Sequence, residues 1–365
     1  MKIGYGLIGL GGIARTHLQG LKCLPILGTP VPALEYAALL TTDPGKEKLA
    51  KDLGFARVEQ DLDEFLALDQ VDVVDICTPN YLHRDQVLAA ARRGKHVYFE
   101  KPLCLNGEEA GRLERELANS DRVFQGAYVL RFLPALARAR ALLAQGAIGP
   151  VHSFRFSLYH SSYLNPQRPG SWRLRHALSG GGALMDLGCH LLDSVRFLLG
   201  EAASVQAWTH TVVKKRPWPQ GEAPVDVDDH ALVVLELENG ARGTVEVSRV
   251  AVGNEGTHLE VYGEKGALHL DPGLAFPRCF DALGREFFPE VTPDPFLTQL
   301  LAVFPPAKLS LGWMVDAHAA SLACFLRGAA GEKVVPGTPT LHEGVKTQLL
   351  LEMAYKSAGE KIDIL

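Results

Sequence analysis

An acid and a histidine stand four residues apart in residues 180–193, which read GGGALMDLGCHLLD. The glycines allow close approach of the backbone, and the apolar residues after them predict a helix. On a helix, Asp186 and His190 point to the same side. A neighbouring carboxylate orients a histidine and favours its charged form. The pattern is typical of a group that takes and returns a proton, although a partly buried histidine beside an incidental acid has the same spacing.

A lysine, Lys101, follows the apolar segment 94–99 and lies in the tripeptide Glu100-Lys101-Pro102. The segment predicts a buried strand, and a charged side chain at the end of such a strand must find a partner. A second predicted strand, at residues 71–77, is followed by residues that we expect to neighbour a cofactor. Open parallel sheets bind ligands beyond the carboxyl ends of their strands, although polar turn chemistry explains the last two residues equally well. The residues are Thr78, Pro79, Asn80 and His83.

The first predicted strand, residues 3–8, leads into a glycine-rich turn and then a helix beginning near Arg15. The turn has the pattern G-x-G-x-x-A. Its first glycine permits a tight turn, its second admits a pyrophosphate, and its alanine allows close packing of helix and strand. Phosphate is expected at the N-terminus of the helix. The predicted dinucleotide contacts in the turn are Gly9, Gly11, Gly12, Ile13 and Ala14.

The residues after the strand predicted at residues 35–40 bear on cofactor preference. An acid there would bind the adenosine ribose and select NAD, but the chain has Thr41 and Thr42. Asp43 precedes a proline and is predicted to be a turn or N-cap residue. Lys46 and Lys48 are near enough to meet a phosphate. These residues favour NADP. If both lysines are instead solvated helix charges, the preference between NAD and NADP stays open.

Composition excludes several classes of protein. The 365 residues carry a net charge of -5, and the only local basic cluster, Lys214-Lys215-Arg216, is predicted to be a solvated loop, so no nucleic-acid partner is expected. Six dispersed cysteines without a CxxC pair favour a reducing cytoplasm and no metal site. The sequence has no long apolar segment, so neither secretion nor membrane insertion is predicted.

Strands and helices alternate in the first part of the chain, which predicts a parallel sheet. The second part has a run of predicted strands, and Glu238-Asn239-Gly240 between two of them predicts an antiparallel hairpin. We therefore expect an α/β protein with a doubly wound Rossmann domain at residues 1–129 and a second α/β domain at residues 130–365. The strands predicted in the second domain are residues 151–159, 203–212, 231–238, 241–250 and 258–263.

Three motifs in this order give the chain a specific resemblance: TPN at 78–80, GKHVYFEKPL at 94–103 and GGGALMDLGCHLLD at 180–193. Together with the glycine turn, they resemble the glucose-fructose oxidoreductase, inositol dehydrogenase and rhizopine-catabolism (Gfo/Idh/MocA) family over nearly the whole chain. The resemblance implies a Rossmann domain followed by a domain with an open, predominantly antiparallel sheet. It also implies that Lys101, Asp186 and His190 are catalytic and contact the substrate.

The resemblance extends to residues near the ligands. It implies that Glu100, Lys101, Arg131 and the pair Trp172-Arg173 lie near the cofactor. Two alternatives are equally open: Arg131 as a surface charge at a helix start, and Trp172 as an anchor that holds its loop against the core. Asp193, one helical turn after His190, is expected to bind a polyol hydroxyl. Weaker candidates for the substrate wall are Tyr159, His160, Asn165 and Asp229. A homodimer or homotetramer is also implied.

The predicted activity is NAD(P)-dependent hydride transfer to or from a secondary alcohol of a sugar, cyclitol or related polyol. His190 would accept the hydroxyl proton, Lys101 would stabilise the oxygen, and Asp186 would orient the pair. One alternative is an inositol 2-dehydrogenase, although residues 254–257 lack a tyrosine found in some of those enzymes. The others are a non-catalytic dinucleotide-dependent sensor and an enzyme whose hydride transfer is a transient step in glycoside cleavage.

Overall fold

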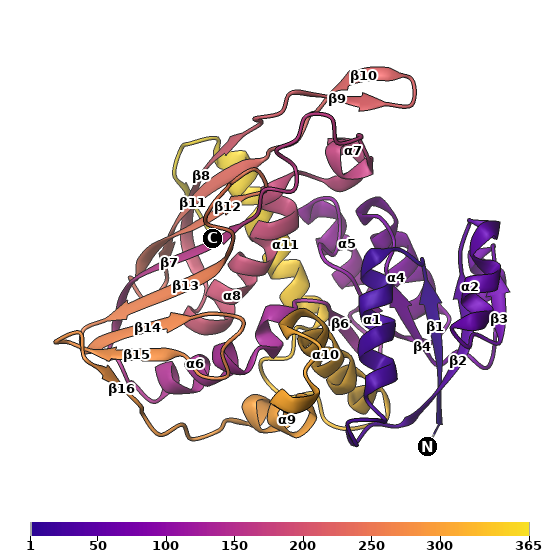
Figure 1. Cartoon of the computed structure of the whole chain (residues 1–365), viewed down its shortest axis with the longest axis horizontal. Helices are drawn as coiled ribbons and strands as arrows, with labels where there is room; N and C mark the ends of the chain where they lie inside the picture. The colour runs from indigo at the N-terminus through magenta and orange to yellow at the C-terminus, as the bar shows by residue number, and fades with distance from the viewer. Residues whose placement is uncertain (1, 365) are drawn as a thin grey trace.

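The computed structural model describes residues 2–364, which form two large β-sheets on opposite sides of the molecule (Figure 1). The first sheet has six strands in the order β3-β2-β1-β4-β5-β6, and all its neighbouring strands are parallel. This confirms the predicted Rossmann sheet. The strands are β1 (Lys2–Ile8), β2 (Ala33–Leu40), β3 (Arg57–Glu59), β4 (Val73–Ile76), β5 (His96–Phe99) and β6 (Phe124–Gly126).

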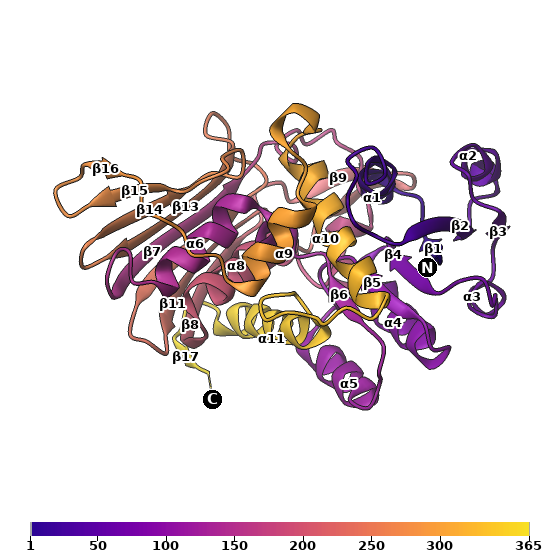
Figure 2. The same ribbon diagram turned by 90° about the horizontal axis from the view of Figure 1, so that it is seen from below.

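Helices cover both faces of this sheet because the strand order runs in opposite directions on either side of β1. Right-handed crossovers then send α1 and α4 to opposite faces, as Figure 2 shows. The ligand crevice of such a sheet lies between the carboxyl ends of β1 and β4. The helices are α1 (Gly12–Cys23), α2 (Glu47–Asp52), α3 (Leu62–Leu66), α4 (His83–Arg92) and α5 (Gly107–Leu117), with 3-10 turns at Pro44–Lys46 and Asn80–Leu82.

The second sheet has nine strands in the order β16-β15-β14-β13-β7-β12-β11-β8-β17. Among its described pairs, β7 with β12 is parallel and the rest are antiparallel, as expected. The predicted hairpin at residues 238–240 joins β11 to β12. The strands are β7 (Val151–Tyr159), β8 (Ala202–His210), β11 (His230–Leu237), β12 (Arg242–Ser248), β13 (Gly256–Gly263), β14 (Gly266–Leu270), β15 (Arg278–Asp281), β16 (Glu286–Phe287) and β17 (Ile362–Asp363).

A layer of helices joins the two sheets (Figure 2). Helices α8 and α11 pack on the nine-stranded sheet, while α10 contacts α1 and α11 also contacts α5. The end of the chain therefore returns to the Rossmann sheet. These helices are α6 (Pro134–Ala144), α7 (His176–Ser179), α8 (Cys189–Leu199), α9 (Pro295–Val303), α10 (Trp313–Ala329) and α11 (Leu341–Ser357), with 3-10 turns at Val129–Phe132, Trp172–Leu174 and Ala307–Leu309.

The basic cluster at residues 214–216 corrects one prediction. Lys214 and Lys215 are exposed, as predicted, but the cluster is not a loop, because β9 (Lys215–Trp218) pairs with β10 (Gly221–Pro224) and Arg216 is buried. The Arg216 guanidinium donates to the backbone oxygens of Tyr163 and Asn165, and these bonds compensate its burial. None of the helices in residues 2–364 is long and apolar enough to cross a membrane.

Candidate active site

The glycine turn lies at the carboxyl end of β1. Gly9 has a φ of +88°, and a Cβ there would lie 2.9 Å from the Cys77 carbonyl oxygen, so this position requires glycine. A Cβ built on Gly11 or Gly12 would meet nothing within 4 Å. The N-terminus of α1 has no side-chain cap. Its backbone N–H groups therefore face open space in which an anion fits.

The space in front of this turn is a cleft of about 500 Å³, which we call the long cleft. It brings together most of the residues predicted to bind a dinucleotide. Ala14 instead packs in the core, as expected for the small residue of the turn. The predicted residues that line the long cleft are Gly9, Gly11, Gly12, Ile13, Thr41, Thr42, Thr78, Pro79, Trp172 and Arg173.

One end of the long cleft contains the residues that bear on cofactor preference. Asp43 Oδ1 accepts a 3.0 Å hydrogen bond from the backbone N of Gly45, which confirms Asp43 as an N-cap. Thr41 Oγ1 accepts from the backbone N of Asp43 at 3.3 Å. Lys46 also lines the cleft, with its Nζ 3.7 Å from the Asp43 carboxylate. A carboxylate and a cation thus stand together at this end.

A second cavity, of about 150 Å³, adjoins the long cleft, and we call it the inner cavity. The two share Ile13, Thr78, Trp172 and Arg173 in their walls. The Arg173 guanidinium lies over the Trp172 ring, 4.4 Å from its centroid, so the pair stands at the junction of the two spaces. The remaining wall of the inner cavity is Asn80, Glu100, Lys101, Ser179, Gly181, Gly182, Met185, Asp186 and Arg249.

Lys101 and Asp186 meet in the inner cavity. Lys101 Nζ donates to Asp186 Oδ1 and to the Asp186 backbone oxygen, each at 2.8 Å. Burial is the largest single influence on both pKa values and opposes ionisation, but the attraction between the two groups, together with the neighbouring charges, outweighs it. This attraction raises the pKa of Lys101 and, with Arg173 and Arg249, lowers the pKa of Asp186. Both side chains are therefore charged at neutral pH.

The segment that carries Asp186 begins as a π-helix, Leu184–Gly188, before α8. Its start is held by Asp228, whose two carboxylate oxygens accept from the backbone N of Gly182 and of Leu184 at 2.9 and 2.8 Å. A Cβ on Gly182 would lie 1.9 Å from the Asp228 carbonyl oxygen. Gly182 therefore permits the close approach of the Asp228 backbone rather than of a ligand. Short π-helical turns are frequent at functional sites.

His190 corrects the prediction of a charged histidine beside Asp186. Burial first, and then the charge of Lys101, lower the pKa of His190 to about 3, so the imidazole is neutral. Within residues 2–364 its Nδ1 is buried without a hydrogen-bond partner, because Asp186 turns to Lys101. The wall of the inner cavity, as far as the described residues form it, does not include His190.

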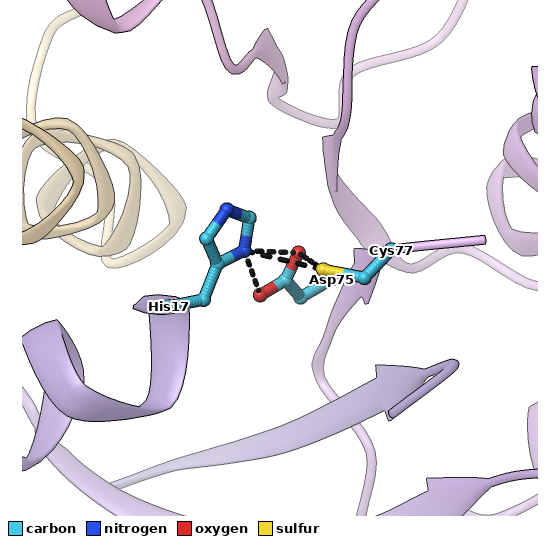
Figure 3. A group of neighbouring side chains, drawn as sticks. All are labelled: His17, Asp75 and Cys77. Carbon is cyan, nitrogen blue, oxygen red and sulfur yellow. Dashed lines mark hydrogen bonds and ion pairs between the residues drawn. The ribbon is translucent and has the colours of Figure 1, made fainter. Parts of the chain in front are cut away.

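Behind Glu100 lies a buried network that the sequence analysis did not identify, centred on His17 (Figure 3). His17 Nδ1 contacts Asp75 at 2.9 Å and Nε2 contacts Glu100 at 3.0 Å, while Cys77 Sγ lies 3.3 Å from Nδ1. Burial opposes protonation, but Asp75 first among the neighbours raises the pKa of His17. Glu100 Oε2 in turn accepts from the backbone N of Lys101 at 3.2 Å. The network thus ties the helix of the glycine turn to the strand end that carries Lys101.

The same network contains donor types that bind metals. His17 with Asp75 and Cys77, and His17 with Glu100 and His318, have side-chain donors within 4.8 Å of one another. Both nitrogens of His17, however, already contact carboxylates at hydrogen-bond distance. Hydrogen bonding therefore accounts for this group.

Four predicted site residues have other partners. His83 is buried with Nδ1 2.7 Å from the Pro102 oxygen and Nε2 2.9 Å from the Thr78 oxygen, so it holds the loops rather than a ligand. Asn80 lines the inner cavity while its Nδ2 donates to the Ser179 oxygen at 2.8 Å. Arg131 and Asp193 bind each other, as described next.

Arg131 and Asp193 form a buried pair outside both spaces. Arg131 Nε and Nη2 donate to the two oxygens of Asp193 at 2.7 and 2.6 Å, and Nη2 also donates to Glu343 at 2.8 Å. Neither residue belongs to the walls that the described residues give the long cleft and the inner cavity. This geometry corrects the expectation that Arg131 faces the cofactor and Asp193 the substrate, because each satisfies the charge of the other.

Comparisons with known proteins agree with this architecture. Residues 3–128 match the family described as an oxidoreductase family with an NAD-binding Rossmann fold. Residues 136–269 match the Gfo/Idh/MocA C-terminal domain. The chain belongs to the Gfo/Idh/MocA oxidoreductase family. The predicted family is therefore confirmed for both parts of the chain.

Relatives of this Gfo/Idh/MocA protein include sugar and cyclitol dehydrogenases. Levoglucosan dehydrogenase of Pseudarthrobacter phenanthrenivorans is 29% identical over 384 residues, covering 98% of this chain and 97% of that protein. Myo-inositol 2-dehydrogenase of Thermotoga maritima is 28% identical over 267 residues, covering 73% and 74%. The solved structure of levoglucosan dehydrogenase with NADH and levoglucosan has a TM-score of 0.89 and 29% identity over 100% of both chains.

Sequence reasoning missed Arg249, which lines the inner cavity directly after β12. No local motif marks it, since an arginine at a strand end is ordinary. The one available signal is Asp229, a weak candidate for the substrate wall that proves to be the partner of Arg249.

Proposed function

We propose that this oxidoreductase transfers a hydride between a nicotinamide dinucleotide and a secondary alcohol carbon of a neutral sugar, anhydrosugar or cyclitol. The observation that carries the proposal is the contact of Lys101 with Asp186 in a small cavity that opens from the long cleft. A dinucleotide in the long cleft would bring its nicotinamide to the wall that the two spaces share. The relatives that act on levoglucosan and myo-inositol support the class of substrate.

The residues present fit a dinucleotide. Gly11 and Gly12 leave open space at the uncapped N-terminus of α1, where a pyrophosphate is stabilised by N–H groups and the helix dipole. Arg173, at the junction of the two spaces, supplies a cation for the same phosphates. The bound cofactor supplies the carbon that accepts or returns the hydride.

Three side chains handle the proton and the charge on the substrate oxygen. Lys101, protonated because its pKa is raised, donates to the hydroxyl oxygen and stabilises the negative charge that develops during oxidation. His190 is neutral, as an acceptor of the hydroxyl proton must be, and lies one helical turn beyond Asp186, so its ring would have to turn toward the inner cavity to take that proton. Asp186 holds Lys101 in position through the 2.8 Å contact. We propose these three as the catalytic residues.

The proposal extends to domains and assembly. Residues 1–129 would bind the dinucleotide, and residues 130–365 would supply Asp186, His190 and the surface that pairs subunits. One face of the nine-stranded sheet carries the helices α8 and α11, which leaves the other face for a second copy in a homodimer or homotetramer.

The adenosine end of the long cleft is expected to accept NADP as well as NAD. Thr41 replaces an acid at the end of β2, and Lys46 lies where it can meet a 2′-phosphate. Thr41→Asp should lower kcat/KM with NADP about ten- to a hundredfold relative to NAD, because the new carboxylate repels that phosphate. Lys46→Ala should weaken NADP alone. Lys48, unlike Lys46, is not among the described residues that line the long cleft, so Lys48→Ala is the matched control. Equal preference in all variants would refute this assignment.

The experiment that tests the function follows nicotinamide absorbance with purified protein, NAD and NADP separately, and a panel of levoglucosan, inositols, aldoses and sugar acids. Reduction of a cofactor by a neutral polyol is the expected result. Tight binding of both cofactors without reduction by any compound would instead favour a sensor. Retained cofactor together with glycoside cleavage would favour transient hydride transfer.

A further inference from the structure

Arg249 lies in the wall of the inner cavity and has a terminal nitrogen without a hydrogen-bond partner among residues 2–364. The residue is 1% exposed, and its Nη2 is buried without a partner in the part of the chain that the structure describes. The same wall contains Lys101 and Asp186. A buried donor without an acceptor is rare and costly in a folded protein. The unpartnered Nη2 therefore points to an acceptor that belongs to a ligand.

The guanidinium of Arg249 is held in place from behind. Its Nε donates to Asp229 Oδ1 at 3.2 Å, and its backbone N donates to the Asp229 oxygen at 3.0 Å. Asp229 Oδ2 accepts from the backbone N of Val212 and of Val213 at 3.0 and 2.9 Å. The ring of Tyr163 lies 4.5 Å from the guanidinium carbon. One edge of Arg249 is thus fixed, which presents the terminal nitrogens in a defined orientation.

The position of Arg249 separates it from the cofactor. Arg173 lines both the long cleft and the inner cavity, whereas Arg249 lines the inner cavity and is not among the described residues that line the long cleft. Its charge helps to lower the pKa of Asp186, so the two groups lie within electrostatic reach of each other. An acceptor bound by Arg249 would therefore belong to the molecule that also meets Lys101.

We propose that Arg249 is a specificity-determining residue that donates through its free edge to a hydroxyl or ether oxygen of the substrate, away from the reacting carbon. This inference rests on the proposed polyol dehydrogenase activity and deepens it. The class of ligand follows from charge. Lys101 is paired with Asp186 and Arg249 with Asp229, and Arg173 and Glu100 add one charge of each sign, so the charges at the wall balance. A neutral polyhydroxylated ring preserves that balance, whereas a carboxylate would add an unmatched negative charge near Asp186.

The test compares Arg249→Lys and Arg249→Gln with the wild type. Lysine keeps a positive charge beside Asp229, which guards against loss of folding. It lacks the planar guanidinium that donates through the free edge. With the neutral polyol that the wild type uses best, KM should rise about ten- to a hundredfold while kcat changes little. The dissociation constant of NADH should stay the same. Arg242→Lys, on the exposed end of the same strand, is the matched control and should leave KM unchanged.

Monodeoxy analogues of the substrate identify the oxygen. One analogue should raise KM for the wild type by the same factor as Arg249→Lys, and combining that analogue with the variant should add nothing. Unchanged KM for every polyol with a lowered melting temperature would make Arg249 purely structural and overturn the proposal. A weaker NADH affinity would make it a cofactor residue. A wild-type preference for sugar acids that Arg249→Lys abolishes would overturn the neutral class.

Equilibrium binding of the same polyols to NADH-loaded protein separates this inference from the proposed function. Binding that depends on Arg249 without any turnover would sustain the inference and remove the dehydrogenase activity. Turnover with an Arg249-independent KM would sustain the activity and remove the inference. No polyol binding to the wild type would overturn the inference outright.

Discussion

Two ion pairs, each formed by a cation with an aspartate from the same helical stretch, differ in their surroundings. Lys101 contacts Asp186 at 2.8 Å, and Arg131 contacts Asp193 at 2.6 Å. The side chains of the first pair are 14% and 37% exposed, and those of the second are 2% and 1% exposed. Access to a cavity, rather than the contact itself, separates a pair that can meet a substrate from one that cannot.

The pKa values of the two carboxylates are shifted in opposite directions. Burial opposes the charge of both, yet the pKa of Asp186 is lowered by Lys101 whereas the pKa of Asp193 is raised despite Arg131. Burial is the largest influence on the pKa of Asp193, and two hydrogen bonds from Arg131 hold its carboxylate in the interior. The buried pair, Arg131 with Asp193, therefore joins segments of the fold. The pair of Lys101 with Asp186 keeps a charged amine at the wall of the inner cavity.

The largest expected effect is on turnover, through the pair of Lys101 with Asp186 at the inner cavity. Lys101→Met should lower kcat by about 10²- to 10⁴-fold, because it removes the charge that stabilises the substrate oxygen, while NADH affinity and melting temperature change little. Lys95→Met is the matched control, because Lys95 lies at the opposite end of β5 with its Nζ on the Leu68 oxygen. Steady-state kinetics of both variants check this, and nearly full turnover by Lys101→Met would end the proposed mechanism.

The next effect is on stability through the buried pair. Asp193→Ala should lower the free energy of unfolding by about 3–5 kcal/mol, because it leaves the buried Arg131 guanidinium with only the partly exposed Glu343 carboxylate and the Gly337 backbone oxygen among its described partners. Asp186→Ala should cost about 1 kcal/mol or less, since its side chain is partly solvated. Denaturant titration measures both values. Equal losses from the two variants would erase the distinction between the pairs.

Local patterns in the sequence predicted the glycine turn, the Rossmann strands apart from β3, five of the nine strands of the second sheet and the neighbourhood of Lys101 and Asp186. These features depend on residues close in the chain or on strand ends that must meet at one edge of a sheet. Asp193 was misplaced because its spacing from His190 does not reveal that Arg131, 62 residues away, takes up its charge. His17 and Arg249 were missed for the same reason, since their partners, such as Glu100 for His17, come from distant segments.

The smallest expected effect concerns His190, which lies between the two aspartates on this stretch. Because its folded pKa is about 3, below the ordinary 6.5, its contribution to stability is present above pH 6.5 and is lost as the pH falls toward 3. His190→Gln should therefore lose less stability than the wild type between pH 7.5 and 5. His318→Gln should act alike, since burial and the charge of His17 lower the pKa of His318 to about 3. Denaturation midpoints at the two pH values measure the difference, and identical slopes in all three proteins would show that these histidines are not held neutral by the fold.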